Sequence, residues 1–151
     1  MTRLAITIES PRAPGVAELL RAGEMFSAAL YPADENFFLT PEELEEPGVT
    51  VFVGRMDTTA VGMAALVLDG ESAELKRLFV SDLARGRGVA GGVLDALEEH
   101  ARGAGARVIR LETGNRSDAA LALYEKRGYR LIPRFGPYID SESSLCMELP
   151  L

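Results

Sequence analysis

The chain has 151 residues, of which 47% are hydrophobic and 26% charged, proportions typical of one globular domain. A single cysteine, Cys146, and a single histidine, His100, exclude an intramolecular disulfide and a Cys/His zinc cluster. The net charge of −7 argues against a nucleic-acid or anionic-membrane partner, because both favour a basic surface. We therefore expect one domain, residues 1–151, in a reducing cytoplasmic compartment, with no metal, nucleic acid or membrane among its partners.

Charge is distributed unevenly along the chain. Residues 1–75 carry 4 basic and 13 acidic side chains, a net charge of −9. Residues 76–134 carry 12 and 7, a net charge of +5, and residues 135–151 carry 0 and 3, a net charge of −3. The negative total therefore conceals a basic middle segment between acidic flanks.

The first forty residues predict a strand and a helix. Residues 3–9 alternate apolar and polar side chains, which indicates a half-buried strand and leaves no apolar segment typical of a signal peptide. Apolar spacing over residues 14–30 predicts an amphipathic helix with Pro14 in its first turn. Thr40-Pro41-Glu42-Glu43 has the pattern of a capping box and predicts a short acidic helix.

The remaining elements predict an α/β fold of the α+β type. Residues 49–55 and 60–68 form a predicted hairpin, and Asp69-Gly70 turns into a strand over residues 74–80. A helix of about four turns follows from Val89, and then the order is strand 108–112, helix 119–127 capped by Ser117, and strands 129–132 and 145–149. The implied architecture is a mixed, mostly antiparallel central sheet of about six to seven strands, flanked by helices, with one βαβ crossover in its second half.

A glycine-rich loop, residues 85–92 (RGRGVAGG), lies between a predicted strand and a predicted helix. Glycines let backbone approach a ligand closely, and the free N–H groups and positive dipole end of a helix N-terminus favour an anion. Arg85 and Arg87 add forked donors suited to phosphate. The segment therefore predicts a phosphate cradle.

Two nucleotide-binding patterns fit this loop poorly. The P-loop pattern fails because Gly92-Val93 stand where Lys-Ser/Thr should be. Gly86-x-Gly88-x-x-Gly91 matches the dinucleotide fingerprint, and Glu112 could contact a ribose, so an NAD(P)-binding oxidoreductase remains an alternative. Against it, Ser81–Arg85 separate the strand from the first glycine, and the hairpins upstream do not suit a parallel sheet.

A third pattern resembles the GCN5-related N-acetyltransferase (GNAT) family. Arg85-x-x-Gly88-x-Ala90 matches that family's Q/R-x-x-G-x-G/A loop, placed after a strand and opening a helix. Asn115 and the block AALALYEKRGY over residues 119–129 resemble its fourth-helix signature, N…A…LYEKxGF. The resemblance covers at least residues 49–132, and the segments 111–114 and 135–138 resemble a bacterial branch of small-molecule acetyltransferases.

The resemblance implies a GNAT fold and an acetyl-CoA-dependent N-acetyltransferase. It implies that backbone groups of Leu78, Phe79 and Val80 bind pantetheine and polarise the thioester carbonyl. The pyrophosphate would then lie on the loop, so the implied cofactor-binding residues are Leu78, Phe79, Val80, Arg85, Gly86, Arg87, Gly88, Val89, Ala90 and Asn115. A non-catalytic acyl-CoA-binding module is a second alternative.

The catalytic groups would be a tyrosine and a carboxylate. Tyr124 matches the family's general acid for the departing thiolate. For the general base, Glu74 at the start of one strand is the first choice and Glu112 at the end of its neighbour the second. His100 and Cys146 are expected to be packed or structural, so direct attack in a ternary complex is favoured over a covalent route.

The acceptor site is the least specified. The resemblance places it near Tyr31 and Glu35, with Tyr138 closing it from the other side. The acidic flanks favour an amine-bearing, cationic small molecule as the acceptor. A homodimer is expected because dimers are common in families of this kind.

Overall fold

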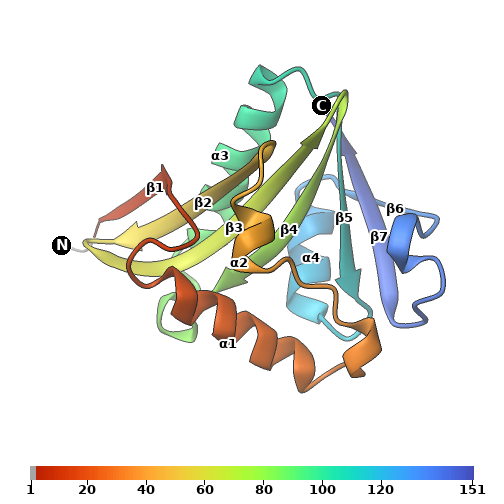
Figure 1. Ribbon diagram of the computed structural model, residues 1–151, viewed down its shortest axis with the longest axis horizontal. Helices are drawn as coiled ribbons and strands as arrows, with labels where there is room; N and C mark the ends of the chain where they lie inside the picture. The colour runs from red at the N-terminus through yellow and green to blue at the C-terminus, as the bar shows by residue number, and fades with distance from the viewer. Residues whose placement is uncertain (1–2) are drawn as a thin grey trace.

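The computed structural model describes residues 3–151, which form one seven-stranded mixed sheet with helices on both faces (Figure 1). The strands lie in the order β1-β2-β3-β4-β5-β7-β6. Their bounds are β1 Leu4–Ile8, β2 Val49–Met56, β3 Thr59–Asp69, β4 Ser72–Val80, β5 Val108–Gly114, β6 Arg130–Ile132 and β7 Ser144–Pro150. The helices are α1 Val16–Ala28, α2 Pro41–Leu44, α3 Val89–Gly103 and α4 Asp118–Lys126, with 3-10 turns η1 Ala33–Glu35, η2 Asp82–Ala84 and η3 Gly136–Tyr138. Residues 1 and 2, part of the N-terminal segment assessed above, lie outside the described residues.

The sheet topology confirms the predicted combination of hairpins and one crossover. Within residues 3–151, neighbouring strands are antiparallel except for β4 and β5, which are parallel. Helix α3 makes the crossover between those two strands, because parallel neighbours require a long connection. The mixed, mostly antiparallel sheet expected from the sequence is therefore correct.

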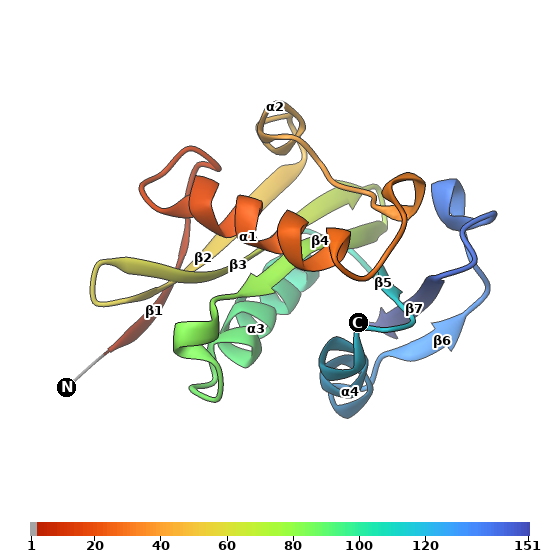
Figure 2. The same cartoon turned by 90° about the horizontal axis from the view of Figure 1, so that it is seen from below.

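Helices cover both faces of the sheet (Figure 2). Helices α1 and α2 lie on one face, here called the α1 face, where Val16, Leu19 and Leu20 pack against strands β2 and β3. Helices α3 and α4 lie on the other face, here called the α3/α4 face, over a larger core that includes Leu97 and Tyr124. Each fully buried aliphatic side chain stabilises the fold by roughly 1.5–3 kcal/mol.

Local capping agrees with the sequence at one helix and differs at two others. At α2 the Thr40 hydroxyl accepts from the Glu43 N–H at 3.1 Å, and the Glu43 carboxylate accepts from the Thr40 N–H at 3.0 Å. Helix α1 begins at Val16 after Gly15, so Pro14 precedes the helix instead of lying in its first turn. Ser117 precedes α4 but makes no capping hydrogen bond.

Strand β4 contains a bulge at Arg77. In the pairing with β3, Arg77 and Leu78 lie opposite the single residue Ala64, and Arg77 has φ of 63°. A bulge inserts one residue and shifts the alternation of side chains between the two faces. Lys76 and Arg77 consequently both lie toward the α1 face, while Leu78 and Val80 pack on the α3/α4 core.

Strands β4 and β5 pair only over part of their length. Residues 72–75 pair with 108–111, and beyond Leu75 and Leu111 the two strands diverge (Figure 1). The backbone groups of residues 76–80 that face β5 therefore have no partner strand on that side. This gap in the middle of the sheet connects the two faces and positions the site described next.

Candidate active site

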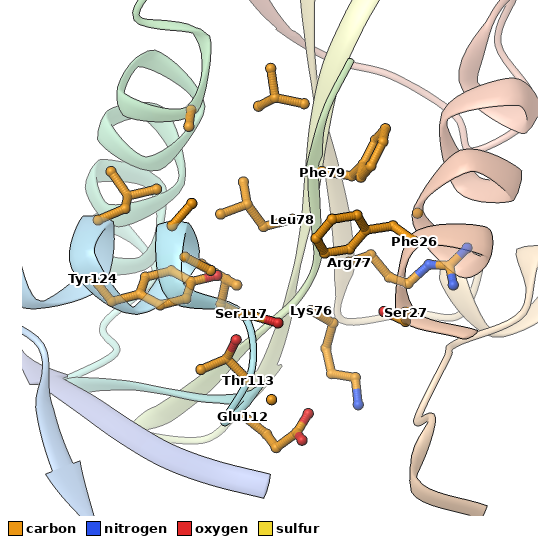
Figure 3. Close-up of a pocket in the computed structure, with 18 of the residues that line it drawn as sticks. Phe26, Ser27, Lys76, Arg77, Leu78, Phe79, Glu112, Thr113, Ser117 and Tyr124 are labelled. Atoms are coloured by element: carbon orange, nitrogen blue, oxygen red, sulfur yellow. The ribbon is translucent and has the colours of Figure 1, made fainter. Parts of the chain in front are cut away.

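A cavity of about 910 Å³ lies at the gap between β4 and β5. Its lining includes the divergent halves of both strands, the glycine-rich loop, α1, α4 and the segment between α1 and α2. Figure 3 shows side chains from α1, β4, β5 and α4 converging on the gap. The cavity therefore joins residues that are far apart in the sequence and on opposite faces of the sheet.

The glycine-rich loop forms the end of the cavity next to α3. Gly86 and Gly88 have φ of 77° and 76°, in the left-handed region that other residues disfavour, and a Cβ at either position would meet no atom within 4 Å. Gly88 precedes α3 and offers no side-chain cap, so the first-turn N–H groups at Val89 and Ala90 remain available to a ligand. Open space, free amides and the helix dipole together fit the pyrophosphate of acetyl-CoA.

The neighbouring arginines differ in position. Arg85 lines the cavity and its guanidinium lies 3.0 Å from the Asp82 carboxylate. Arg87 is exposed and is not part of the lining. Of the pair expected from the sequence to bind phosphate, Arg85 is therefore the one that lines the cavity.

The unpaired edge of β4 forms the floor of the gap. Leu78, Phe79 and Val80, for which the resemblance implied a role in cofactor binding, all line the cavity. Leu78 and Val80 face the α3/α4 core, while Phe79 lies toward α1, where its ring packs against Gly23. Free strand amides and carbonyls can pair with the amide groups of a pantetheine arm as a neighbouring strand would.

Tyr124 approaches the gap from α4. Its side chain is 4% exposed, and its ring centroid lies 5.5 Å from that of Tyr129. Within residues 3–151, every fully buried polar side-chain atom has a hydrogen-bond partner. The Tyr124 hydroxyl makes no hydrogen bond to these residues, so it is not fully buried and opens into the cavity (Figure 3). Burial, and then the negative charge of Glu112, raises the pKa of Tyr124, so it holds its proton and can act as a donor.

Glu112 approaches the same gap from the opposite face. One carboxylate oxygen accepts from the Ser144 hydroxyl at 2.6 Å, and the other has no hydrogen bond within the described residues. Glu112 lines the cavity beside Lys76 (Figure 3). Burial raises the pKa of Glu112, against the lowering effects of the Ser144 hydrogen bond and the Lys76 charge. A partly buried carboxylate of raised pKa suits proton acceptance near neutral pH.

Glu74 lies behind the cavity and is not part of its lining. Its carboxylate accepts a hydrogen bond from the Tyr138 hydroxyl at 2.6 Å and lies 3.7 Å from the Lys76 ammonium. Lys76 in turn donates to the Tyr138 hydroxyl at 2.7 Å. Tyr138, which does line the cavity, is 1% exposed, and burial followed by the Glu74 hydrogen bond raises its pKa.

Tyr31 and Glu35 hold the segment between α1 and α2 across the cavity. The Tyr31 hydroxyl lies 2.7 Å from the Ser117 hydroxyl, and its ring lies so close to Gly114 that no side chain fits there. The Glu35 carboxylate accepts from both the N–H and the hydroxyl of Ser143, which lowers the pKa of Glu35. Both residues line the cavity, but each also fastens this segment to the far side of the sheet.

Three other sequence candidates lie outside the lining. Asn115 is exposed, and its backbone N–H donates to the Ser143 carbonyl at 2.7 Å. His100 packs its ring against Phe52 at 5.5 Å, and Cys146 is buried with a free thiol, as expected for packed and structural residues.

Two features of the site were not predicted from the sequence. Lys76 and Arg77 both line the cavity, because the bulge brings Arg77 to the same face as Lys76. Two consecutive charges inside an otherwise alternating strand were the available signal. The apolar side chains of the segment between α1 and α2 also line it. That segment lacked a regular period, so its orientation could not be predicted.

The comparisons with known proteins agree on one family. The family model for the acetyltransferase (GNAT) family matches residues 15–129. An IAA acetyltransferase from Azospirillum brasilense is 37% identical over 153 residues, which is 100% of both chains. The chain belongs to the GNAT family. It is accordingly an acetyltransferase, and acetyl-CoA is its acyl donor, as the sequence resemblance implied.

Two solved structures resemble this GNAT chain over nearly all of its length. A structure from Klebsiella pneumoniae, assigned as an acyl-CoA N-acyltransferase, has a TM-score of 0.82 at 31% identity and covers 98% of this chain and 97% of that one. PaiA N-acetyltransferase from Thermoplasma acidophilum, solved in complex with coenzyme A, has a TM-score of 0.80 at 18% identity, with 99% of each chain covered. The second likeness shows the fold alone. Family and sheet topology together exclude the dinucleotide-binding alternative, which needs a doubly wound parallel sheet.

Two further observations concern the described part of this GNAT chain. Within residues 3–151 no helix is long and apolar enough to span a bilayer. Over the same residues, no group of three or more His, Cys, Asp or Glu side chains is placed to hold a metal ion.

Proposed function

We propose that the protein transfers an acetyl group from acetyl-CoA to the primary amine of a small molecule by direct attack in a ternary complex. The observation that carries the proposal is the placement of a proton donor and a proton acceptor on opposite sides of one gap. Tyr124 reaches the gap from the α3/α4 face, and Glu112 reaches it from the α1 face. The donor would then lie along the α3/α4 face and the acceptor along the α1 face.

The proton balance of this reaction assigns a role to each group. The amine nitrogen forms a bond to the acetyl carbon, and the bond from that carbon to sulfur breaks. Glu112 takes the proton that the amine loses, and Tyr124 supplies a proton to the departing thiolate. Backbone N–H groups at the bulge of β4 support the negative charge that develops on the carbonyl oxygen, since that edge has no partner strand.

Glu112 is favoured over Glu74 as the base. Glu112 lines the cavity with one free carboxylate oxygen, whereas Glu74 is occupied by the Tyr138 hydroxyl behind it. The first choice made from the sequence is therefore replaced in this proposal. Glu74 instead orients Tyr138 and Lys76, which form the wall beside Glu112.

A covalent acetyl-enzyme has no support from the side chains present. The thiol of Cys146 is 1% exposed, does not line the cavity, and burial raises its pKa. His100 is the single histidine and packs against Phe52, away from the cavity. No serine of the lining therefore has a histidine base beside it.

The remaining assignments extend the same proposal. Arg85 and the backbone of residues 86–90 would hold the pyrophosphate, while Arg87 and Asn115 would act from outside the lining. A small acceptor is supported by the segment fastened across the cavity through Tyr31 and Glu35, and by the name of the Azospirillum brasilense relative, an IAA acetyltransferase. One functional domain over residues 1–151, a cytoplasmic location, a homodimer and the lack of a nucleic-acid partner stay predictions.

Acetyl-CoA is expected to raise the melting temperature of the protein. A ligand at 100 times its dissociation constant stabilises the folded state by about 2.7 kcal/mol, which for a chain of this size corresponds to roughly 5–10 °C. Differential scanning fluorimetry with acetyl-CoA, free CoA and NAD(P) measures the shift. An unchanged melting temperature with saturating acetyl-CoA and CoA would refute the donor site. If the melting temperature does rise, measuring thiol release with a panel of amines distinguishes an enzyme from a non-catalytic acyl-CoA-binding module.

Replacing Glu112 by glutamine is expected to stabilise the protein at neutral pH. The raised pKa means that the folded state favours the neutral carboxyl, so wild-type stability is fully present below the unfolded pKa and is lost as pH rises through the folded pKa. The melting temperature of Glu112→Gln should therefore exceed that of wild type at pH 8 and approach it near pH 4. Equal melting temperatures across this range would contradict a buried, destabilising carboxylate.

A further inference from the structure

The acceptor half of the cavity has an aromatic lining. The chain has six phenylalanines and four tyrosines. Six of these ten residues line the cavity from α1, the segment between α1 and α2, β4 or η3: Phe26, Tyr31, Phe37, Phe38, Phe79 and Tyr138. Within this wall the rings of Phe37 and Tyr138 pack edge to face, with centroids 4.9 Å apart and an interplanar angle of 87°. Such a wall favours a flat apolar body over a hydrated chain.

Phe26 is the most accessible ring of this lining. It is 45% exposed, although burial of a phenylalanine is strongly favourable, and it projects from α1 toward the gap beside Arg77 (Figure 3). Its neighbour Met25 is 67% exposed but does not line the cavity. Phe26 therefore has a surface that a bound acceptor could cover.

Two cations of the protein already interact with these aromatic rings. The Lys76 ammonium lies 5.3 Å from the centroid of the Tyr138 ring, and the Arg77 guanidinium lies 5.0 Å from that of Phe38. The Glu24 carboxylate already pairs with the Arg77 guanidinium at 2.8 Å, so it is not free to bind an acceptor. A second ammonium of an acceptor would meet like charges there, so the part of the acceptor distant from Glu112 should carry no positive charge.

We propose that the acceptor is an aryl-alkyl primary amine. Its ammonium group lies at the free carboxylate oxygen of Glu112, and its neutral ring lies against Phe26, Phe37 and Phe38. One positive charge and one aromatic body match the free oxygen of Glu112 and the aromatic wall. This inference rests on the proposed function and specifies the substrate class of the same site.

Steady-state kinetics with three amines tests the class. CoA release from acetyl-CoA is measured with phenethylamine, propylamine and spermidine. The value of kcat/KM for phenethylamine is expected to exceed those for the other two by about tenfold or more, because only phenethylamine covers the aromatic wall without a second charge. A kcat/KM for spermidine or propylamine equal to or above that for phenethylamine would overturn the proposal.

A matched pair of variants assigns the preference to the wall. Phe26→Ala should lower kcat/KM for phenethylamine about threefold to tenfold and leave that for propylamine within about twofold. Met25→Ala, one residue away on the same helix but outside the cavity lining, should change neither value. Equal losses for both amines in Phe26→Ala, or a preference retained unchanged, would contradict contact between this ring and the acceptor.

Binding measurements separate this inference from the proposed function. Titration calorimetry of phenethylamine and spermidine into CoA-saturated protein reports acceptor affinity without turnover. Tighter binding of phenethylamine is expected, and tighter binding of spermidine would refute the aromatic class. If acetyl-CoA binds but no amine causes release of CoA, the proposed function is wrong. If aliphatic amines are acetylated as well as aromatic ones, only the proposed acceptor class is wrong.

Discussion

Tyr124→Phe is expected to lower kcat by about 10²-fold or more while leaving the dissociation constant of acetyl-CoA nearly unchanged. The substitution removes the hydroxyl that opens into the cavity and keeps the ring that packs against Tyr129. Without that hydroxyl the thiolate must leave unprotonated or take its proton from water. Steady-state acetyl transfer to a primary amine, with acetyl-CoA affinity measured by calorimetry, gives the two quantities.

Tyr129→Phe provides a matched control for the loss of a buried tyrosine hydroxyl. Tyr129 is 2% exposed and donates to the Glu98 carboxylate at 3.0 Å, but it does not line the cavity. Its removal should cost about 1 kcal/mol of stability and leave kcat within about twofold. A wild-type rate in Tyr124→Phe, or an equal kcat loss in both variants, would remove Tyr124 from its role as proton donor.

Gly88→Val is expected to weaken acetyl-CoA binding by about 100-fold or more without unfolding the protein. Gly88 has φ of 76°, and a side chain there would point into open space, with no protein atom within 4 Å of its Cβ. In the proposed donor site that space, in front of the first turn of α3, holds the pyrophosphate, so the added side chain would exclude it from the helix amides. Calorimetry with acetyl-CoA and thermal unfolding measure affinity and stability separately.

Gly105→Val carries the same backbone penalty away from the cradle. Gly105 follows the other end of α3, has φ of 89°, and its Cβ would likewise meet nothing within 4 Å. Left-handed backbone costs a non-glycine residue about 1–2 kcal/mol, and a β-branched one more, so both variants should lose comparable stability. Only Gly88→Val should lose affinity, and retained binding in that variant would contradict a phosphate site at this loop.

Elements with strong local signals were predictable from the sequence. The capping box at Thr40 appears as expected because its two hydrogen bonds join residues only three apart. The hairpin strands were also correctly placed, since alternation and short turns determine their pairing locally. The glycine-rich loop was found for the same reason, as strand, glycines and helix are contiguous in the chain.

Features that depend on sheet register were not predictable. The bulge at Arg77 moves one charged side chain to the α1 face, and only the pairing with β3 defines that shift. The ranking of Glu74 above Glu112 came from their places at strand ends, whereas the difference between them arises from Tyr138, a residue more than sixty positions away from Glu74. The aromatic wall also joins segments from four parts of the chain and had no period to reveal it.

The divergence of β4 from β5 has a consequence for the order of events. The two parts of the sheet, β1 to β4 and β5 to β7, are joined as strands by only four residue pairs, at one end of the gap. A pantetheine arm lying along the free edge of β4 would act as a removable strand and stiffen the partition between the two faces. An acceptor arriving afterwards would meet walls that are already ordered and lose less conformational entropy on binding. Donor binding would thereby prepare the opposite face for the acceptor, with no moving lid required.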